Sequence, residues 1–146
     1  MISQVYGGGG NTGAPYQNDF VELFNRSASP ISITGWSVQY ASATGTGNFA
    51  SNSVTALSGV LAAGQYYLVK EAGGTVGAAL PLADASGTVN MSGTGGKVIL
   101  ATTSTGLAWY NLAVPSSGAA GQLYTVVVRP FGGSAPTLYA VLQLRR

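Results

Sequence analysis

The chain has 146 residues, a formal net charge of +2 and 7% charged residues, and it contains neither histidine nor cysteine. The missing residue types exclude disulfides, thiolate metal ligands, Ser-His-Asp and Cys-His catalysis and nearly every zinc site. The length suits a single domain with one core. Six basic residues, two of them at the C-terminus, are too few for the basic stripe that nucleic acid requires.

Short apolar runs with a two-residue period alternate with Gly, Ser and Asn clusters, which predicts strands rather than helices. The first strand covers residues 2–6, and a glycine-rich loop with positive φ angles follows at 7–13. The second strand covers residues 19–25. Its side chains alternate between two faces, and the two sets are Phe20, Glu22 and Phe24 on one face and Val21 and Leu23 on the other.

A turn at 25–30 precedes a strand with its large side chains inward. Trp36, Val38 and Tyr40 alternate there with Ser37 and Gln39, a pattern typical of a half-buried strand. A low-complexity loop follows at 41–53. Further strands are predicted at 66–70, 88–91, 97–102, 123–129 and 137–144, with a weaker one at 106–112. In the 66–70 strand the two adjacent tyrosines point to opposite faces, so one of them is exposed.

These patterns predict an all-β domain of roughly eight to ten short strands in two packed antiparallel sheets or a barrel. The chain has no run of 18 apolar residues, so we expect no membrane insertion.

Asp19 and Glu22 form the only close acidic pair in the sequence. A spacing of three on a strand places them on opposite faces, so they do not converge like a glycosidase pair. A calcium site built from Asp19, Glu22 and neighbouring oxygens such as that of Asn18 is a weak alternative, because calcium takes six to eight oxygen ligands. We expect instead that Asp19 ends a turn and that Glu22 pairs locally. The predictions are therefore no catalytic residues, no metal, no cofactor and no enzymatic activity.

Residues 93–97 end in Gly-Lys like a phosphate-binding loop. Val98 stands where such a loop has Ser or Thr, and a strand follows instead of a helix, so the segment is predicted to be a turn. The tyrosines and tryptophans are expected mostly in the core, with a sugar- or peptide-binding face as the alternative.

Several segments together resemble the lamin-tail domain in its bacterial extracellular form. They occur in the family's order over about residues 1–105, and they are 2–11 (ISQVYGGGGN), 18–26 (NDFVELFNR), 35–42 (GWSVQYAS), 61–68 (LAAGQYYL) and 96–100 (GKVIL). The resemblance implies an immunoglobulin-like antiparallel β-sandwich in a secreted or cell-surface protein, and an interaction or anchoring role without catalysis. The sequence departs from the family pattern after residue 105.

We therefore expect one lamin-tail-like domain over 1–146 with a divergent C-terminal hairpin at about 115–146. Its partner is expected to be a protein or a cell-surface component, with the export signal removed from this chain. The alternative is a subunit that self-assembles into an extracellular filament or surface layer by donating its C-terminal strand, which carries no internal charge or proline. The residues of that candidate self-association strand are Leu138, Tyr139, Val141, Leu142 and Leu144.

Overall fold

The computed structural model describes residues 1–44 and 49–107, together with two strands at 123–128 and 138–143. Apart from one short 3₁₀ turn, the regular elements in this part of the chain are strands. They are β1 (Ile2–Tyr6), β2 (Asn18–Phe24), β3 (Ile31–Ser32), β4 (Ser37–Ser42), η1 (Phe49–Ser51), β5 (Val54–Ala56), β6 (Val60–Leu61), β7 (Tyr66–Gly73), β8 (Ala85–Ser86), β9 (Gly96–Ala101), β10 (Leu123–Val128) and β11 (Leu138–Gln143).

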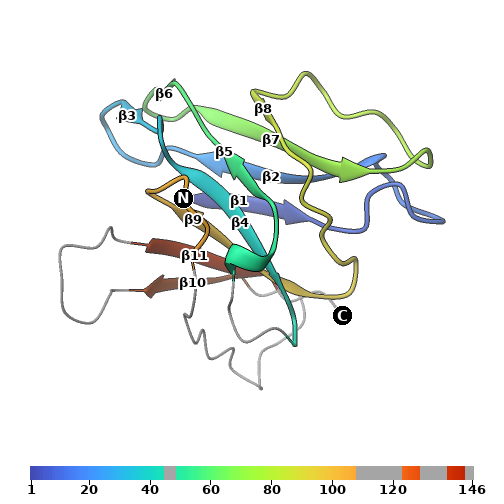
Figure 1. The fold of residues 1–146 in the computed structure, drawn as a ribbon. Coiled ribbons are helices and arrows are strands. Elements are labelled where there is room, and N and C mark those ends of the chain that lie inside the picture. Colours follow the sequence, from blue (N-terminus) through green and yellow to red (C-terminus); the bar gives the residue numbers. More distant parts are fainter. Residues whose placement is uncertain (45–48, 108–122, 129–137, 144–146) are drawn as a thin grey trace.

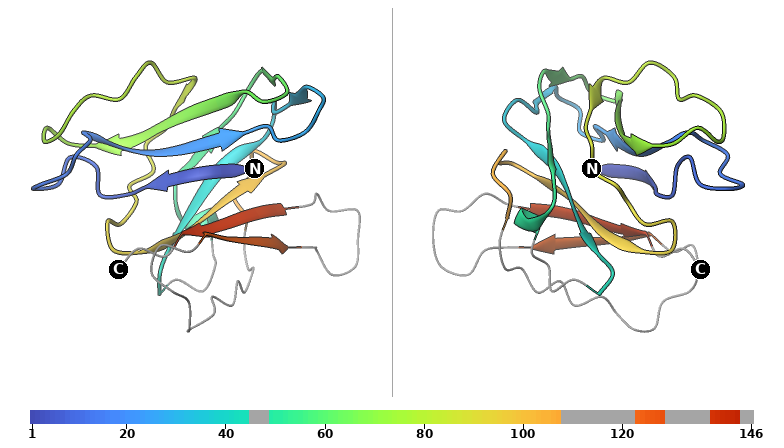
Figure 2. Two further views of the ribbon diagram at one scale, coloured as in Figure 1. Left: turned by 180° about the vertical axis from the view of Figure 1, so that it is seen from behind. Right: turned by 45° about the vertical axis from the view of Figure 1, so that its right-hand side comes forward.

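Two sheets face each other as layers (Figure 1). The first sheet has the order β1-β2-β7-β8 and the second has the order β10-β11-β9-β4-β5, while β3 and β6 form a small separate ribbon. All paired strands are antiparallel except β7 and β8. Figure 2 shows β11 and β10 continuing the second layer beyond β9. The predicted antiparallel sandwich is confirmed.

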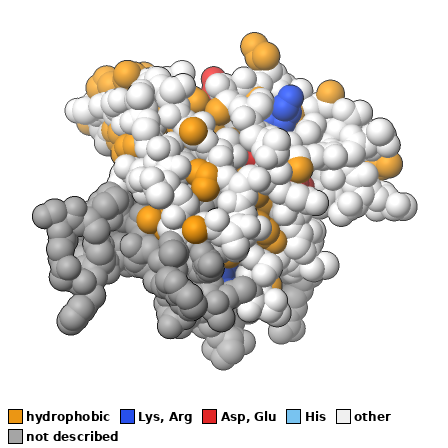
Figure 3. Space-filling model, in the orientation of Figure 1, with side chains coloured by type: hydrophobic (Ala, Val, Ile, Leu, Met, Phe, Trp, Pro, Cys, Tyr) orange, Lys and Arg blue, Asp and Glu red, His pale blue; other side chains and the backbone are white. Residues whose placement is uncertain are grey.

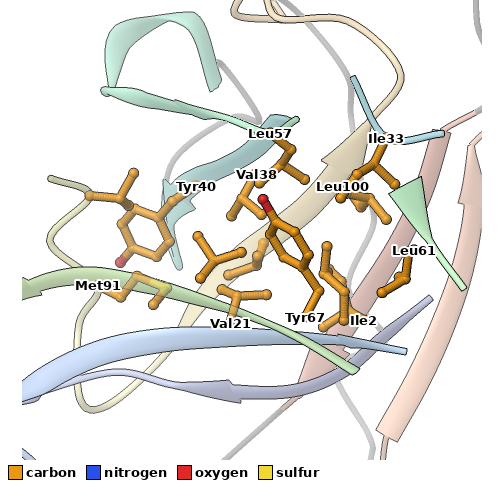
Figure 4. Packing of buried hydrophobic residues seen from close by; sticks show 14 residues of the cluster. Ile2, Val21, Ile33, Val38, Tyr40, Leu57, Leu61, Tyr67, Met91 and Leu100 are labelled. Atoms are coloured by element: carbon orange, nitrogen blue, oxygen red, sulfur yellow. The ribbon is translucent and has the colours of Figure 1, made fainter. Parts of the chain in front are cut away.

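The main core lies between the two sheets, and side chains from both of them meet there (Figure 4). Alternation places Val21 and Leu23 of β2 in this core, and Val98 and Leu100 of β9 face them from the other layer. The full buried cluster is Ile2, Val21, Leu23, Ile33, Val38, Tyr40, Leu57, Leu61, Tyr67, Val69, Val89, Met91, Val98 and Leu100.

Strand β4 is buried on both faces, so the prediction of a half-buried strand is wrong. Val38 and Tyr40 point into the core as expected, but Ser37 and Gln39 on the other face are also fully buried. The segment at 102–107 covers this second face. Ser37 Oγ donates to the Thr103 carbonyl at 2.6 Å, and the Gln39 amide bonds to the same segment. Polar residues thus mark a packed surface here, because their hydrogen bonds are satisfied inside the protein.

The predicted strand at 88–91 is absent from the structure, which has only the two-residue β8 just before it. Val89 and Met91 are buried as a strand pattern requires, but their backbone N–H groups donate to carboxylate side chains rather than to a neighbouring strand. The β8–β9 connection, residues 87–95, is therefore ordered without being a strand.

The glycine-rich loop after β1 packs against the loop after β7 at one end of the sandwich (Figures 1 and 2). Gly10 has a φ of 75° and forms an isolated bridge with Val76, and Gly74 N donates to the Gln17 carbonyl at 2.8 Å. A Cβ on Gly10 would overlap the backbone of Gly74. Glycine is required here for both its φ and the close approach of the two chains.

Candidate functional site

Two carboxylates reach into the sandwich from neighbouring strands of the first sheet. Asp19 lies on β2 in phase with the inward Val21, and Glu71 lies on β7 in phase with the inward Val69; each acid is 1% exposed. The register of β2 and β7 shifts between Asn18 and Phe20, which leaves Asp19 opposite the end of β7. The Asn18 side chain also donates to the Glu71 carbonyl at 3.0 Å.

Both oxygens of Asp19 accept hydrogen bonds from backbone N–H groups that are distant in sequence. Gly9 N donates to Oδ1 at 2.6 Å, and Met91 N donates to Oδ2 at 2.7 Å. One side chain thereby joins the glycine-rich loop after β1 to the β8–β9 connection. Hydrogen bonds to an ionised acceptor are short and strong, so Asp19 acts as a latch between two irregular segments.

Glu71 holds the same connection two residues earlier, because Val89 N donates to its Oε2 at 3.0 Å. Its second oxygen, Oε1, is buried without a hydrogen-bond partner, and so is the hydroxyl oxygen of Thr55 on β5. Gly87 closes over the pair, since a Cβ at that position would overlap both Thr55 Oγ1 and Glu71 Oε2. The Glu71 side is therefore tightly packed but incompletely hydrogen-bonded.

Burial raises the pKa of both carboxyl groups above its ordinary value, because the ionised form loses hydration. The backbone donors Gly9 and Met91 partly oppose this effect on the pKa of Asp19. The nearby Thr55 hydroxyl and then the backbone N–H of Val89 do so for Glu71. The negative charge of Asp19 adds to the rise in the pKa of Glu71. The two acids thus hold the connection in place at an electrostatic cost.

The two weak calcium candidates lie on opposite faces of β2, as their spacing indicates. Asp19 points inward, whereas Glu22 is half-buried on the outer face and accepts from Ser3 Oγ at 2.7 Å. The structure does not bring them together, and the described residues contain no cluster of three or more acidic, histidine or cysteine side chains that suits a metal. The neighbour of Asp19 inside the fold is instead Glu71, which the sequence reasoning missed. The signal was its phase, two residues after the inward Val69.

The remaining carboxylate also binds the chain itself. Asp84, an exposed residue just before β8, accepts from Leu68 N at 2.7 Å and so fixes the start of the parallel β7–β8 pair. All four carboxylates of the sequence lie in the described residues, and each accepts at least one hydrogen bond from this chain.

The candidate self-association strand contains β11. Its backbone lies between β10 and β9, with Tyr139 opposite Leu100 of β9 and six register pairs to β10, so both of its edges are paired within this chain. Leu144 lies outside the described residues.

The Gly-Lys segment at 93–97 leads into β9 rather than into a helix, and Lys97 is buried. The segment at 93–97 is therefore not a phosphate-binding loop.

Exposed apolar side chains gather at the end of the molecule that carries β3 and β6 (Figure 3). Tyr66 is 57% exposed while Tyr67 is buried, which confirms that the two rings point to opposite faces. The Tyr66 ring lies 4.6 Å from that of Phe24, measured between centroids, and Val60 is 65% exposed on β6. We call Val60 and Tyr66 the apolar end. At the other end of the first sheet, Tyr6, Tyr16 and Phe20 form a cluster of their own.

The Lamin Tail Domain family model matches residues 1–126, which covers most of the chain and reaches into β10. The chain belongs to the lamin-tail domain family. The resemblance predicted over residues 1–105 is confirmed, and with it the immunoglobulin-like form of the sandwich. The family model also covers residues 106–126, so the predicted departure from the family after residue 105 is wrong. Lamin-tail domains are protein-interaction or structural modules of a non-catalytic kind. No curated protein and no solved structure matches the chain significantly.

One further observation concerns membranes. Among the described residues of this lamin-tail domain, no helix is long and apolar enough to cross a bilayer.

Proposed function

We propose that this lamin-tail domain is a non-catalytic interaction or anchoring module of a secreted or cell-surface bacterial protein. Its partner in this proposal is a protein or a component of the cell surface. The resemblance to the bacterial extracellular form of the family supports the location, as does a composition in which Gly, Ser, Thr, Ala and Asn largely replace charged residues.

The observation that carries the proposal is the use of the four carboxylates. Asp19 and Glu71 hold backbone N–H groups in the interior, and Glu22 and Asp84 are engaged with Ser3 and Leu68 on the surface. A general acid–base pair needs two groups that converge on a substrate with pKa values matched to their task. Asp19 and Glu71 instead accept hydrogen bonds from backbone N–H groups of this chain, which has no histidine or cysteine to take their place in catalysis.

The apolar end supplies the contact surface in this proposal. Val60 and Tyr66 are exposed on the consecutive strands β6 and β7, which lie in different sheets and are connected by a short turn at 62–65. Exposed aromatic and aliphatic side chains beside each other are typical anchors of protein interfaces. Arg26 follows Asn25, whose backbone bonds to Gly64 and Gln65 of this turn, so a positive charge borders the apolar end.

The test uses the chain fused to a reporter enzyme behind an export signal, in the organism that encodes it. The wild-type fusion is expected to remain with the cell envelope, and the double variant Val60→Ser, Tyr66→Ser is expected to pass into the medium. Leu82→Ser is the matched control, since Leu82 is 98% exposed in a different loop. Equal retention of both variants would remove the apolar end from the proposal. Metal-dependent hydrolysis of phosphate esters by the purified chain would contradict the non-catalytic role.

A further inference from the structure

The two large sheets end in four edge strands, and these differ in how well they are protected. Strand β8 has two residues and β5 has three, and the register of β1 is broken between Ile2 and Gln4. Short edge strands and bulges are the usual protection against pairing with another chain. Strand β10 has neither, because it has six residues and pairs with β11 in unbroken register from Leu123 to Val128.

The sequence of β10 also lacks the residues that normally block an open edge. Leu-Tyr-Thr-Val-Val-Val contains no charge, proline or glycine and consists mainly of residues with high β-propensity. One side of its backbone pairs with β11, and no described strand pairs with the other side. An uncharged, regular edge of this length is a template for strand addition.

We propose that β10 pairs with β10 of a second copy of this chain, antiparallel about a two-fold axis. The two five-stranded sheets then join into one continuous sheet across a closed dimer. This inference concerns a different surface from the apolar end and does not depend on the proposed function.

Charge and proline next to β10 set the direction and the length of the pairing. Arg129 follows the strand directly. A parallel in-register pair would place the two Arg129 residues side by side, whereas the antiparallel arrangement sets them at opposite ends, and like charges directly opposite are destabilising. Pro130 has no backbone N–H to add to the ladder, so the pairing stops there. With the axis at Thr125, this residue lies opposite its own counterpart, and residues 123–127 of the two strands are paired.

A second copy is favoured over a foreign peptide for two reasons. The edge is complementary to itself. The strand has no charge that would repel its own copy, and antiparallel pairing keeps the two Arg129 residues apart at opposite ends. The net charge of the chain is only +2, so two copies repel each other weakly. No strand has to leave its own fold, in contrast to donation of the C-terminal strand, in which β11 would have to separate from both neighbours.

The test measures the mass of the purified chain by sedimentation velocity from about 1 to about 100 μM, because a small interface falls at the weak end of the affinity range. We expect a shift from monomer to dimer with rising concentration, and no larger species. Thr125→Lys places two like charges beside the axis and is expected to abolish the dimer, while its circular dichroism stays that of the wild type. Val126→Lys, at the next position of the strand, is the second variant in case the first does not fold.

Cysteine cross-linking locates the contact, and the chain is suited to it because it has no cysteine of its own. Under mild oxidation, Thr125→Cys is expected to form disulfide-linked dimers severalfold faster than Leu82→Cys, a control that is 98% exposed. A monomer at every concentration, or cross-linking no faster than that of the control, would overturn the inference. Filaments that disappear when residues 137–146 are deleted would also overturn it, in favour of strand donation.

Discussion

The interior carboxylates and the buried amide of Gln39 solve the same structural problem in two different ways. Asp19 and Glu71 hold the β8–β9 connection on the inner side of the first sheet. Gln39 holds the 102–107 segment on the outer side of the second sheet, where its Nε2 donates to Ser37 Oγ and to the Thr105 carbonyl and its Oε1 accepts from Leu107 N. Each latch fixes a backbone segment that is not part of a strand.

The difference between the two latches lies in charge and in completeness. Gln39 is neutral, fully buried and bonded at both its nitrogen and its oxygen. The carboxylates form short bonds but lose hydration, and Glu71 Oε1 remains without a partner. A charged latch therefore binds more strongly at each contact and depends on pH, whereas a neutral latch is independent of pH.

Removal of the carboxylate that joins two loops is expected to have the largest effect. Asp19→Ala leaves the N–H groups of Gly9 and Met91 buried without acceptors, and each such group costs about 1–3 kcal/mol. We expect the free energy of unfolding to fall by about 3 kcal/mol. Chemical denaturation measures it. Asp84→Ala removes a similar bond to Leu68 N at an exposed site, and equal losses in the two variants would show that burial of the latch is unimportant.

Loss of the neutral latch is expected to be somewhat less costly, because its remaining partners lie nearer to solvent. Gln39→Ala should lower the free energy of unfolding by about 2 kcal/mol, by the same amount at pH 5 and pH 7. Hydrogen exchange should show loss of protection at the Leu107 amide. Gln65→Ala, which removes an exposed bond to Ala62 N, is the control. A pH-dependent loss in Gln39→Ala would erase the distinction between the two latches.

The strands were predictable from the sequence because their pattern is local, and the latches were not because their partners are distant. The alternation in β2 correctly separated Phe20 and Val21 onto opposite faces. The bond from Met91 N to Asp19 spans 72 residues, and neither residue type signals the other. Gln39 has the alternation of a solvent-facing residue. The Thr105 carbonyl and the Leu107 N–H that bury it are backbone groups of a later segment, which no side-chain pattern reveals.

Close packing over Glu71 predicts a smaller effect at a glycine. Gly87→Ala inserts a methyl group against Thr55 and Glu71, and overpacking of this kind costs about 1–3 kcal/mol. We expect a loss near 1.5 kcal/mol, in the lower half of that range. Gly95→Ala is the matched control, since its Cβ would make only an ordinary contact with Ala43. If thermal unfolding shows the same midpoint for both variants, the interior around Glu71 is less tightly packed than the structure indicates.

The smallest change in stability, and the most informative, is expected from Glu71→Gln. Its oxygen can accept from Val89 N as Glu71 Oε2 does, and its NH₂ group can donate to Thr55 Oγ1, which now has no partner. Because the variant removes a buried charge and satisfies an unpaired atom, we expect a gain of about 1 kcal/mol at pH 7.

The pH dependence of that difference tests the charged latch most directly. The pKa of Glu71 is raised in the folded chain above its ordinary value of 4.5, so the folded state binds more protons than the unfolded state between the two values. The free energy of unfolding of the wild type should therefore fall as pH rises from about 4.5 through the folded-state pKa. The Glu71→Gln profile should be flatter, so that the two curves separate with rising pH. Parallel curves, or a wild type that gains stability relative to the variant over this window, would contradict the account.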